Sequence, residues 1–142
     1  MTYLRRSIRD EGGQAAVEFA LVLPFLLVLI VGIVEFGRAW NEHQVITDAA
    51  RETARAASLP GDITVADAKK VAYDAMLNAG IDTSKAIIDF PPTGNPNTGS
   101  NNPVAVTIDL RYRFTFFAPL MAWATGDEII HLKTSFAMRN ES

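Results

Sequence analysis

The sequence predicts an α+β fold: a long N-terminal helix, transmembrane and then amphipathic, a second short helix, and a small antiparallel sheet of about three strands. Two observations support this class. The first is an unbroken apolar run over residues 15–34, followed by an alanine-rich, proline-free segment over residues 37–59. The second is a change to alternating apolar and polar residues after residue 86, which is typical of strands with one wet face.

The apolar run, AAVEFALVLPFLLVLIVGIV from Ala15 to Val34, contains Glu18 as its one charged residue. About 20 helical residues span the ~30 Å hydrocarbon core of a bilayer, whereas a core helix of a soluble protein seldom runs this long without a polar face. Arginines are concentrated on the N-terminal flank, which favours a cytoplasmic N-terminus. We therefore expect residues 14–36 to cross the inner (cytoplasmic) membrane once, with the C-terminal head outside the cytoplasm.

A cleaved secretory signal peptide is the alternative interpretation of this run. Such a signal has a shorter apolar core, followed by a cleavage site of the small-x-small type. The run ends instead in EFGRAW, from Glu35 to Trp40, which offers no good site of this kind. We therefore favour a membrane anchor.

The helix is expected to continue past the membrane as an amphipathic segment over residues 37–59. Small or apolar residues recur there at three- and four-residue spacing, and charged residues occupy the other faces. Pro60 and Gly61 end the helix. The small and apolar stripe consists of Ala39, Val45, Ile46, Ala49, Ala50, Thr53, Ala54 and Ala57.

Residues 60–142 are expected to form a globular α+β head that begins with the second helix. Thr64 can cap this helix, with Asp67 three residues later as its capping-box partner. The sequence Asn78-Ala79-Gly80 provides the stop signal. The helix that results is short and follows the long one closely.

Three strands follow in the head: Ala86–Phe90, Val104–Phe116 and a last one over residues 130–138, with a proline- and glycine-rich loop between the first two. In the middle strand we expect Tyr112 and Phe114 to fill the space beneath a covering helix. The apolar face of the sheet needs such a cover, and the alanine-rich half of the long helix and the second helix can supply it.

Composition and motifs argue against an enzyme, a metal site and a nucleic-acid binder. The formal net charge is −3, the opposite of the basic footprint that nucleic acid requires, and cysteine is absent, which excludes thiolate chemistry. His43 and His131 have no second ligand at zinc-binding spacing, and no phosphate-binding loop occurs. We therefore expect no cofactor, no metal and no catalytic residue.

Glu18 needs an explanation, because a carboxylate in hydrocarbon is costly unless it lies near the interface, is protonated or is paired. In one interpretation, its side chain extends to the cytoplasmic interface. In the other, cleavage between Gly13 and Gln14 creates an α-amine on Gln14 that pairs with Glu18 of the same or a neighbouring subunit. A helix that leaves the bilayer to pack against copies of itself needs pairing of this kind.

These residues resemble a known family. A basic leader at residues 1–13 ending in Gly12-Gly13, then QAAVEF and an apolar helix, resembles the class III signal of type IV pilin-like proteins. More narrowly, AVEFALVLP at Ala16–Pro24 and EFGR at Glu35–Arg38 resemble the TadE-like pseudopilins of tight-adherence (Tad, or Flp) pilus systems. The similarity is strong over residues 9–57 and weaker over the sheet.

The resemblance implies that a prepilin peptidase cuts between Gly13 and Gln14, and that Glu18, Phe19 and Pro24 belong to the assembly segment. The partners it implies are the peptidase, other pilin and pseudopilin subunits, the inner-membrane assembly platform and membrane lipid. It implies a minor pilin with an initiating, tip or adaptor role in a pilus used for adhesion or secretion, since bulk Flp pilins are little more than the helix. An uncleaved single-pass accessory protein of the cell envelope is the alternative.

Overall fold

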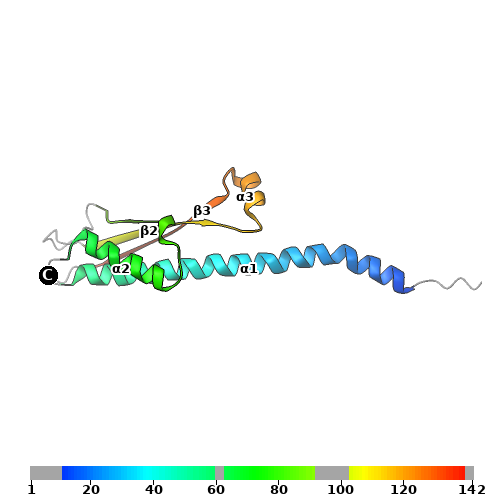
Figure 1. The fold of residues 1–142 in the computed structure, drawn as a ribbon, viewed down its shortest axis with the longest axis horizontal. Helices are drawn as coiled ribbons and strands as arrows, with labels where there is room; N and C mark the ends of the chain where they lie inside the picture. The colour runs from blue at the N-terminus through cyan, green and yellow to red at the C-terminus, as the bar shows by residue number, and fades with distance from the viewer. Residues whose placement is uncertain (1–10, 60–62, 92–102, 140–142) are drawn as a thin grey trace, which may run out of the picture. The chain divides into compact units, whose positions relative to one another are not determined.

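The computed structural model describes residues 11–59, 63–91 and 103–139 (Figure 1). The predicted α+β class is confirmed, with a long apolar helix, a shorter helix and a three-stranded antiparallel sheet. Most of the leader, the helix stop at Pro60 and Gly61, and most of the proline-rich loop lie outside the described residues. The elements are α1 (Glu11–Ser58), α2 (Val65–Asn78), the 3-10 turn η1 (Thr83–Lys85), β1 (Ala86–Asp89), β2 (Val104–Arg113), α3 (Ala118–Thr125) and β3 (Ile129–Met138).

The chain divides into two compact units, Met1–Val34 and Glu35–Ser142. The described part of the first unit is the apolar half of α1, and its side chains from Gly13 to Ile30 are all exposed. Among the described residues, α1 is the one helix long and apolar enough to cross a membrane. It continues through Pro24. Because proline has no N–H to donate to the Ala20 carbonyl, we predict a kink or a loosened turn near Ala20.

The second unit is built on a sheet in the order β1-β2-β3, with both neighbouring pairs antiparallel. β2 is central, and its Ile108 lies opposite Ile88 of β1 and Thr134 of β3. The predicted alternation holds along β2, because every second side chain from Val104 to Tyr112 is buried. In β3, Ile130, Leu132, Thr134, Phe136 and Met138 are half-buried, on the face that the sequence predicts.

The predicted middle strand is too long at its C-terminal end. β2 ends at Arg113 rather than at Phe116, Phe114 is only half-buried, and Phe116 is 69% exposed. The Phe114 ring packs edge-on against Tyr112, with the ring centroids 5.2 Å apart. The backbone leaves the sheet here because the Thr115 and Phe116 amides donate to a carboxylate on α1 instead of to a strand.

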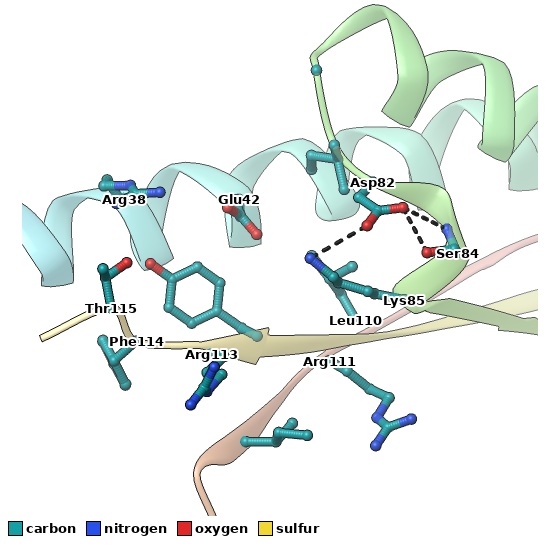
Figure 2. Close-up of a pocket in the computed structure, with 14 residues that line it drawn as sticks. Arg38, Glu42, Asp82, Ser84, Lys85, Leu110, Arg111, Arg113, Phe114 and Thr115 are labelled. Carbon is teal, nitrogen blue, oxygen red and sulfur yellow. Dashed lines mark hydrogen bonds and ion pairs between the residues drawn. The ribbon is translucent and has the colours of Figure 1, made fainter. Parts of the chain in front are cut away.

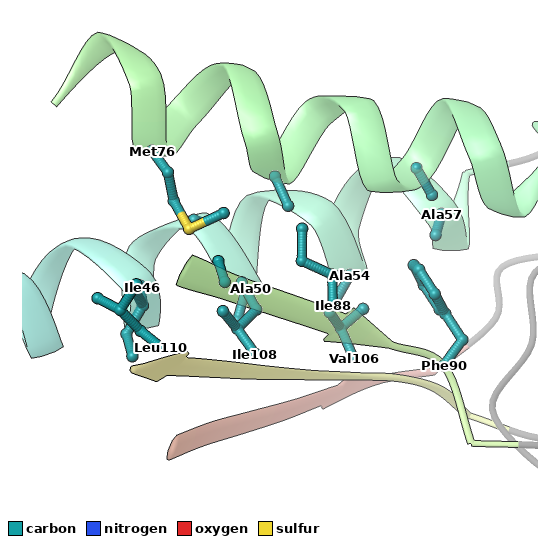
Figure 3. Close-up of a cluster of buried hydrophobic side chains, with 14 of the residues drawn as sticks. Ile46, Ala50, Ala54, Ala57, Met76, Ile88, Phe90, Val106, Ile108 and Leu110 are labelled. Carbon is teal, nitrogen blue, oxygen red and sulfur yellow. The ribbon is translucent and has the colours of Figure 1, made fainter. Parts of the chain in front are cut away.

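The amphipathic half of α1 and the whole of α2 cover the apolar face of the sheet, as predicted (Figure 3). Alanine predominates on both helices, and its single methyl group allows the backbones of helix and sheet to approach closely. The larger side chains of Ile46 and Met76 fill the remaining space and are fully buried. The centre of this core consists of Ile46, Ala50, Ala54, Ala57, Ala68, Ala72, Met76, Ile88, Val106, Ile108 and Leu110.

The local signals predicted at both ends of α2 are confirmed, and α3 also ends at a glycine. The Thr64 hydroxyl accepts from the Asp67 N–H at 3.1 Å, and the Thr64 N–H donates to the Asp67 carboxylate at 3.2 Å, which completes the capping box. Gly80 follows α2 with φ of 80°, and Gly126 follows α3 with φ of 78°, a conformation that glycine adopts without strain.

The core makes a direct stability prediction at Ile108. Ile108→Ala removes a fully buried side chain and should lower the free energy of unfolding by about 2–5 kcal/mol. Ile87→Ala, the same change on a β1 side chain that is 59% exposed, should cost less than about 1 kcal/mol. Urea unfolding of the full chain in detergent micelles measures both free energies. Equal losses for the two variants would mean that the buried and exposed faces of the sheet are assigned wrongly.

Candidate functional site

The residues predicted to serve processing and assembly lie together near the start of α1. Gly13, Gln14, Glu18, Phe19 and Pro24 are all exposed there. Because α1 is already helical at these positions, Gln14 and Glu18 are four residues apart on one helix face. An α-amine created on Gln14 would therefore lie about one helical turn from the Glu18 carboxylate.

Large apolar side chains cover the first unit on all sides. Phe25 is 77% exposed, and the other large apolar residues in this part of the helix are exposed as well. Water cannot accommodate a continuous apolar surface of this length, so the surface needs lipid or neighbouring helices around it. The exposed set is Val17, Phe19, Leu21, Val22, Leu23, Phe25, Leu26, Leu27, Val28, Leu29, Ile30, Ile33 and Val34.

Glu35 begins the second unit, one residue after the apolar run ends, and its side chain is only 2% exposed. Its Oε2 accepts a hydrogen bond from the Thr115 N–H at 2.6 Å and a longer one from the Phe116 N–H at 3.4 Å. Its Oε1 lies 3.8 Å from Nη1 of the exposed Arg38. A buried carboxylate is stable only with such donors, and bonds from peptide groups to an ionised acceptor are strong. Glu35 thus attaches the β2–α3 loop to α1.

Sequence reasoning missed this role. The EFGR segment that contains Glu35 entered only as part of the family resemblance. A carboxylate directly after an apolar run suggests a boundary, but its partner lies 80 residues away in the chain. Nothing in the local pattern around Thr115 indicates that its peptide group faces a glutamate.

A groove of about 810 Å³ opens between α1, η1 and β2 (Figure 2). Arg38 and Glu42 enter it from α1, and Lys85 lies across from them. Burial raises the pKa of Glu42, and the charges of Arg38 and Lys85 offset part of that rise. Lys85 Nζ also lies 3.3 Å from the Asp82 carboxylate. The lining combines acidic and basic side chains and includes no histidine.

The two histidines occupy different settings. His43 stacks on Trp40, with ring centroids 6.2 Å apart. His131 Nδ1 lies 2.8 Å from Asp109, whose carboxylate is also 3.1 Å from Lys133 Nζ. Burial opposes ionisation of Asp109, but the bonds from His131 and Lys133 outweigh it and lower its pKa. These cross-strand contacts tie β2 to β3, and in the described parts of the chain no group of three metal-ligating side chains occurs.

Comparison with known proteins matches residues 13–55 to the family described as TadE-like protein. The match covers the apolar run, Glu35 and most of the amphipathic half of α1, so it confirms the resemblance in that segment. No curated protein and no solved structure matches the chain. The family is one of structural, Tad pilus-associated proteins, and the long apolar helix fits a single-pass membrane anchor.

The Glu35 contacts predict a local effect. Glu35→Ala leaves two peptide donors without their acceptor and should destabilise the second unit by about 1–3 kcal/mol. Amide hydrogen exchange at Thr115 in the full chain, in micelles, should accelerate by about tenfold or more. Arg38→Ala removes only an exposed partner and should cost less than about 1 kcal/mol. An unchanged Thr115 exchange rate in Glu35→Ala would refute the attachment.

Proposed function

We propose that this chain, a TadE-like protein over residues 13–55, is a minor pilin-like structural subunit of a tight-adherence pilus. A prepilin peptidase removes its leader, and the apolar half of α1 then moves from the bilayer into contact with other subunits. The head lies outside the cytoplasm, in an initiating, tip or adaptor role.

The observation that supports this most directly is how the apolar surface is distributed. The core of the second unit is made by the amphipathic half of α1, α2 and the sheet, from Ile46 onward. It uses no residue of the apolar run. That run is therefore available to exchange lipid for the helices of other subunits without unfolding the head, which is what assembly through an N-terminal helix requires.

The positions of Gln14 and Glu18 support a link between processing and assembly. A carboxylate among packed apolar helices is strongly unfavourable unless a cation meets it. Cleavage after Gly13 supplies that cation as the Gln14 α-amine, one turn away on the same helix face or on a neighbouring subunit. The processed helix could then pack against partner subunits without burying an unpaired Glu18 carboxylate.

Processing is tested first. The mature protein should begin at Gln14, because a peptidase that holds the substrate backbone closely favours glycine, which has no side chain, on the leader side of the cut. Gly13→Leu should leave the full-length chain in the membrane. Gly37→Leu is the matched control, since the space around the Gly37 Cβ position is open. Intact-mass spectrometry reads the N-terminus.

A wild-type chain that keeps Met1 in cells containing the peptidase would contradict processing. That result would favour the uncleaved, membrane-anchored accessory protein instead.

Assembly is tested at Glu18. Glu18→Ala should insert into the membrane and be cleaved normally, but its amount in sheared filaments should fall by about tenfold or more. The variant leaves the Gln14 α-amine without its carboxylate partner, and an unpaired charge among packed helices is costly. Glu52→Ala, an exposed carboxylate on the same helix, is the control and should assemble normally. Immunoblots of membrane and filament fractions measure both. Normal assembly of Glu18→Ala would leave only the interpretation in which Glu18 reaches the interface.

A further inference from the structure

We infer that α3 and the preceding Phe116 form a second membrane contact, lying in the headgroup region of the bilayer on the side of the head. The partner is lipid. This goes beyond the proposed function and rests on one part of it, the insertion of the apolar half of α1 into a membrane. We call Phe116, Leu120 and Trp123 the α3 patch.

The sequence around α3 is unusually apolar for an exposed connection between two strands. From Phe114 to Gly126 the chain reads FTFFAPLMAWATG, with no charged residue. Charged residues begin again on both sides, at Arg113 and Asp127, and Arg113 pairs with Glu128. An apolar segment of this length is too short to cross a bilayer, and where the protein does not bury it, it suits the membrane interface.

α3 has two distinct faces. Ala118 is buried, and Met121 and Ala122 are half-buried, so one face packs on the head. Leu120 and Trp123, three residues apart, lie on the other face and are exposed, and Trp123 at 84% is the most exposed large apolar side chain of the second unit. Phe116 adds a third large exposed side chain just before the helix. The head therefore presents a compact apolar patch with no cover of its own.

The hydrogen bonds of Glu35 connect the start of this patch to the residue that follows the apolar run. Glu35 directly follows Val34, the last residue of that run, and its carboxylate accepts from the Thr115 and Phe116 amides. The Phe116 amide thus lies 3.4 Å from the side chain of the first residue after the proposed membrane span. α3 begins two residues later, at the end of the sheet where β2 finishes (Figure 1).

A second pair of aromatic side chains lies at the same boundary on α1. Phe36 and Trp40 are exposed and stack with ring centroids 6.3 Å apart. Trp40 follows the end of the apolar run on α1, and Trp123 belongs to the helix that follows the loop bonded to Glu35. Tryptophan is enriched at membrane–water interfaces, because its ring is apolar and its N–H can bond to the headgroup region.

Lipid is favoured over a second subunit as the occupant. The patch offers no charged group that would select a protein partner, and the loop that leads into it is bonded to Glu35, the first residue after the proposed membrane span. A protein contact remains an outcome that the experiment can detect, and it would overturn the inference.

The test uses the full chain in vesicles of phosphatidylcholine and phosphatidylglycerol. Trp40→Phe leaves Trp123 as the one fluorescent tryptophan. Lipids brominated near the headgroup quench tryptophans in the interface, lipids brominated deep in the acyl chains quench those in the hydrocarbon core, and aqueous iodide quenches those in water. Two reporters are made in a Trp40→Phe, Trp123→Phe background: Phe25→Trp within the apolar run, and Leu77→Trp on exposed α2.

We expect Trp123 emission to be blue-shifted, protected from iodide, and quenched by lipid brominated near the headgroup about as strongly as Phe25→Trp is quenched by lipid brominated deep in the acyl chains. Emission quenched by iodide as strongly as that of Leu77→Trp would overturn the inference. Protection from iodide without lipid quenching would indicate a protein contact and would overturn it as well. Failure of Phe25→Trp to be quenched by lipid would instead refute membrane insertion, and with it both proposals.

Discussion

The buried carboxylate of Glu35 is the contact on which the arrangement of the head depends. A carboxylate that is 2% exposed needs hydrogen-bond donors, and the peptide groups of Thr115 and Phe116 provide them. Because these two peptide groups bond to Glu35 rather than to a strand, β2 ends at Arg113 and the chain continues into α3. Because Glu35 is also the first residue after the apolar run, the same bonds attach the β2–α3 loop to the residue that follows that run.

Small side chains allow the second unit to form its core without the apolar run. Ala50, Ala54 and Ala57 on α1, with Ala68 and Ala72 on α2, let two helices lie close to one face of a small sheet. The core formed in this way needs nothing from the apolar run. In the proposed function, this independence would allow the first unit to exchange lipid for protein while the second keeps its structure.

Much of this fold follows from local signals in the sequence. The capping box of Thr64 and Asp67, the glycine after α2, and the two-residue alternation in β2 each act within a few residues, and each is confirmed. The end of β2 was not predictable in this way. The alternation continues to Phe116, yet the competing acceptor lies 80 residues away in the chain. The roles of Gly13, Gln14 and Glu18 stay predictions, because they concern a protease and neighbouring subunits outside this single chain.

The central claim is that the exposed apolar half of α1 becomes a contact surface between subunits. Photocrosslinking in cells from a photoreactive phenylalanine analogue at position 25 tests it directly, since Phe25 is 77% exposed and outside the core of the head. We predict crosslinks from the cleaved chain to other pilin subunits, and their loss when Gly13→Leu blocks cleavage. A cleaved chain that crosslinks to lipid alone, in cells that are assembling pili, would contradict the claim.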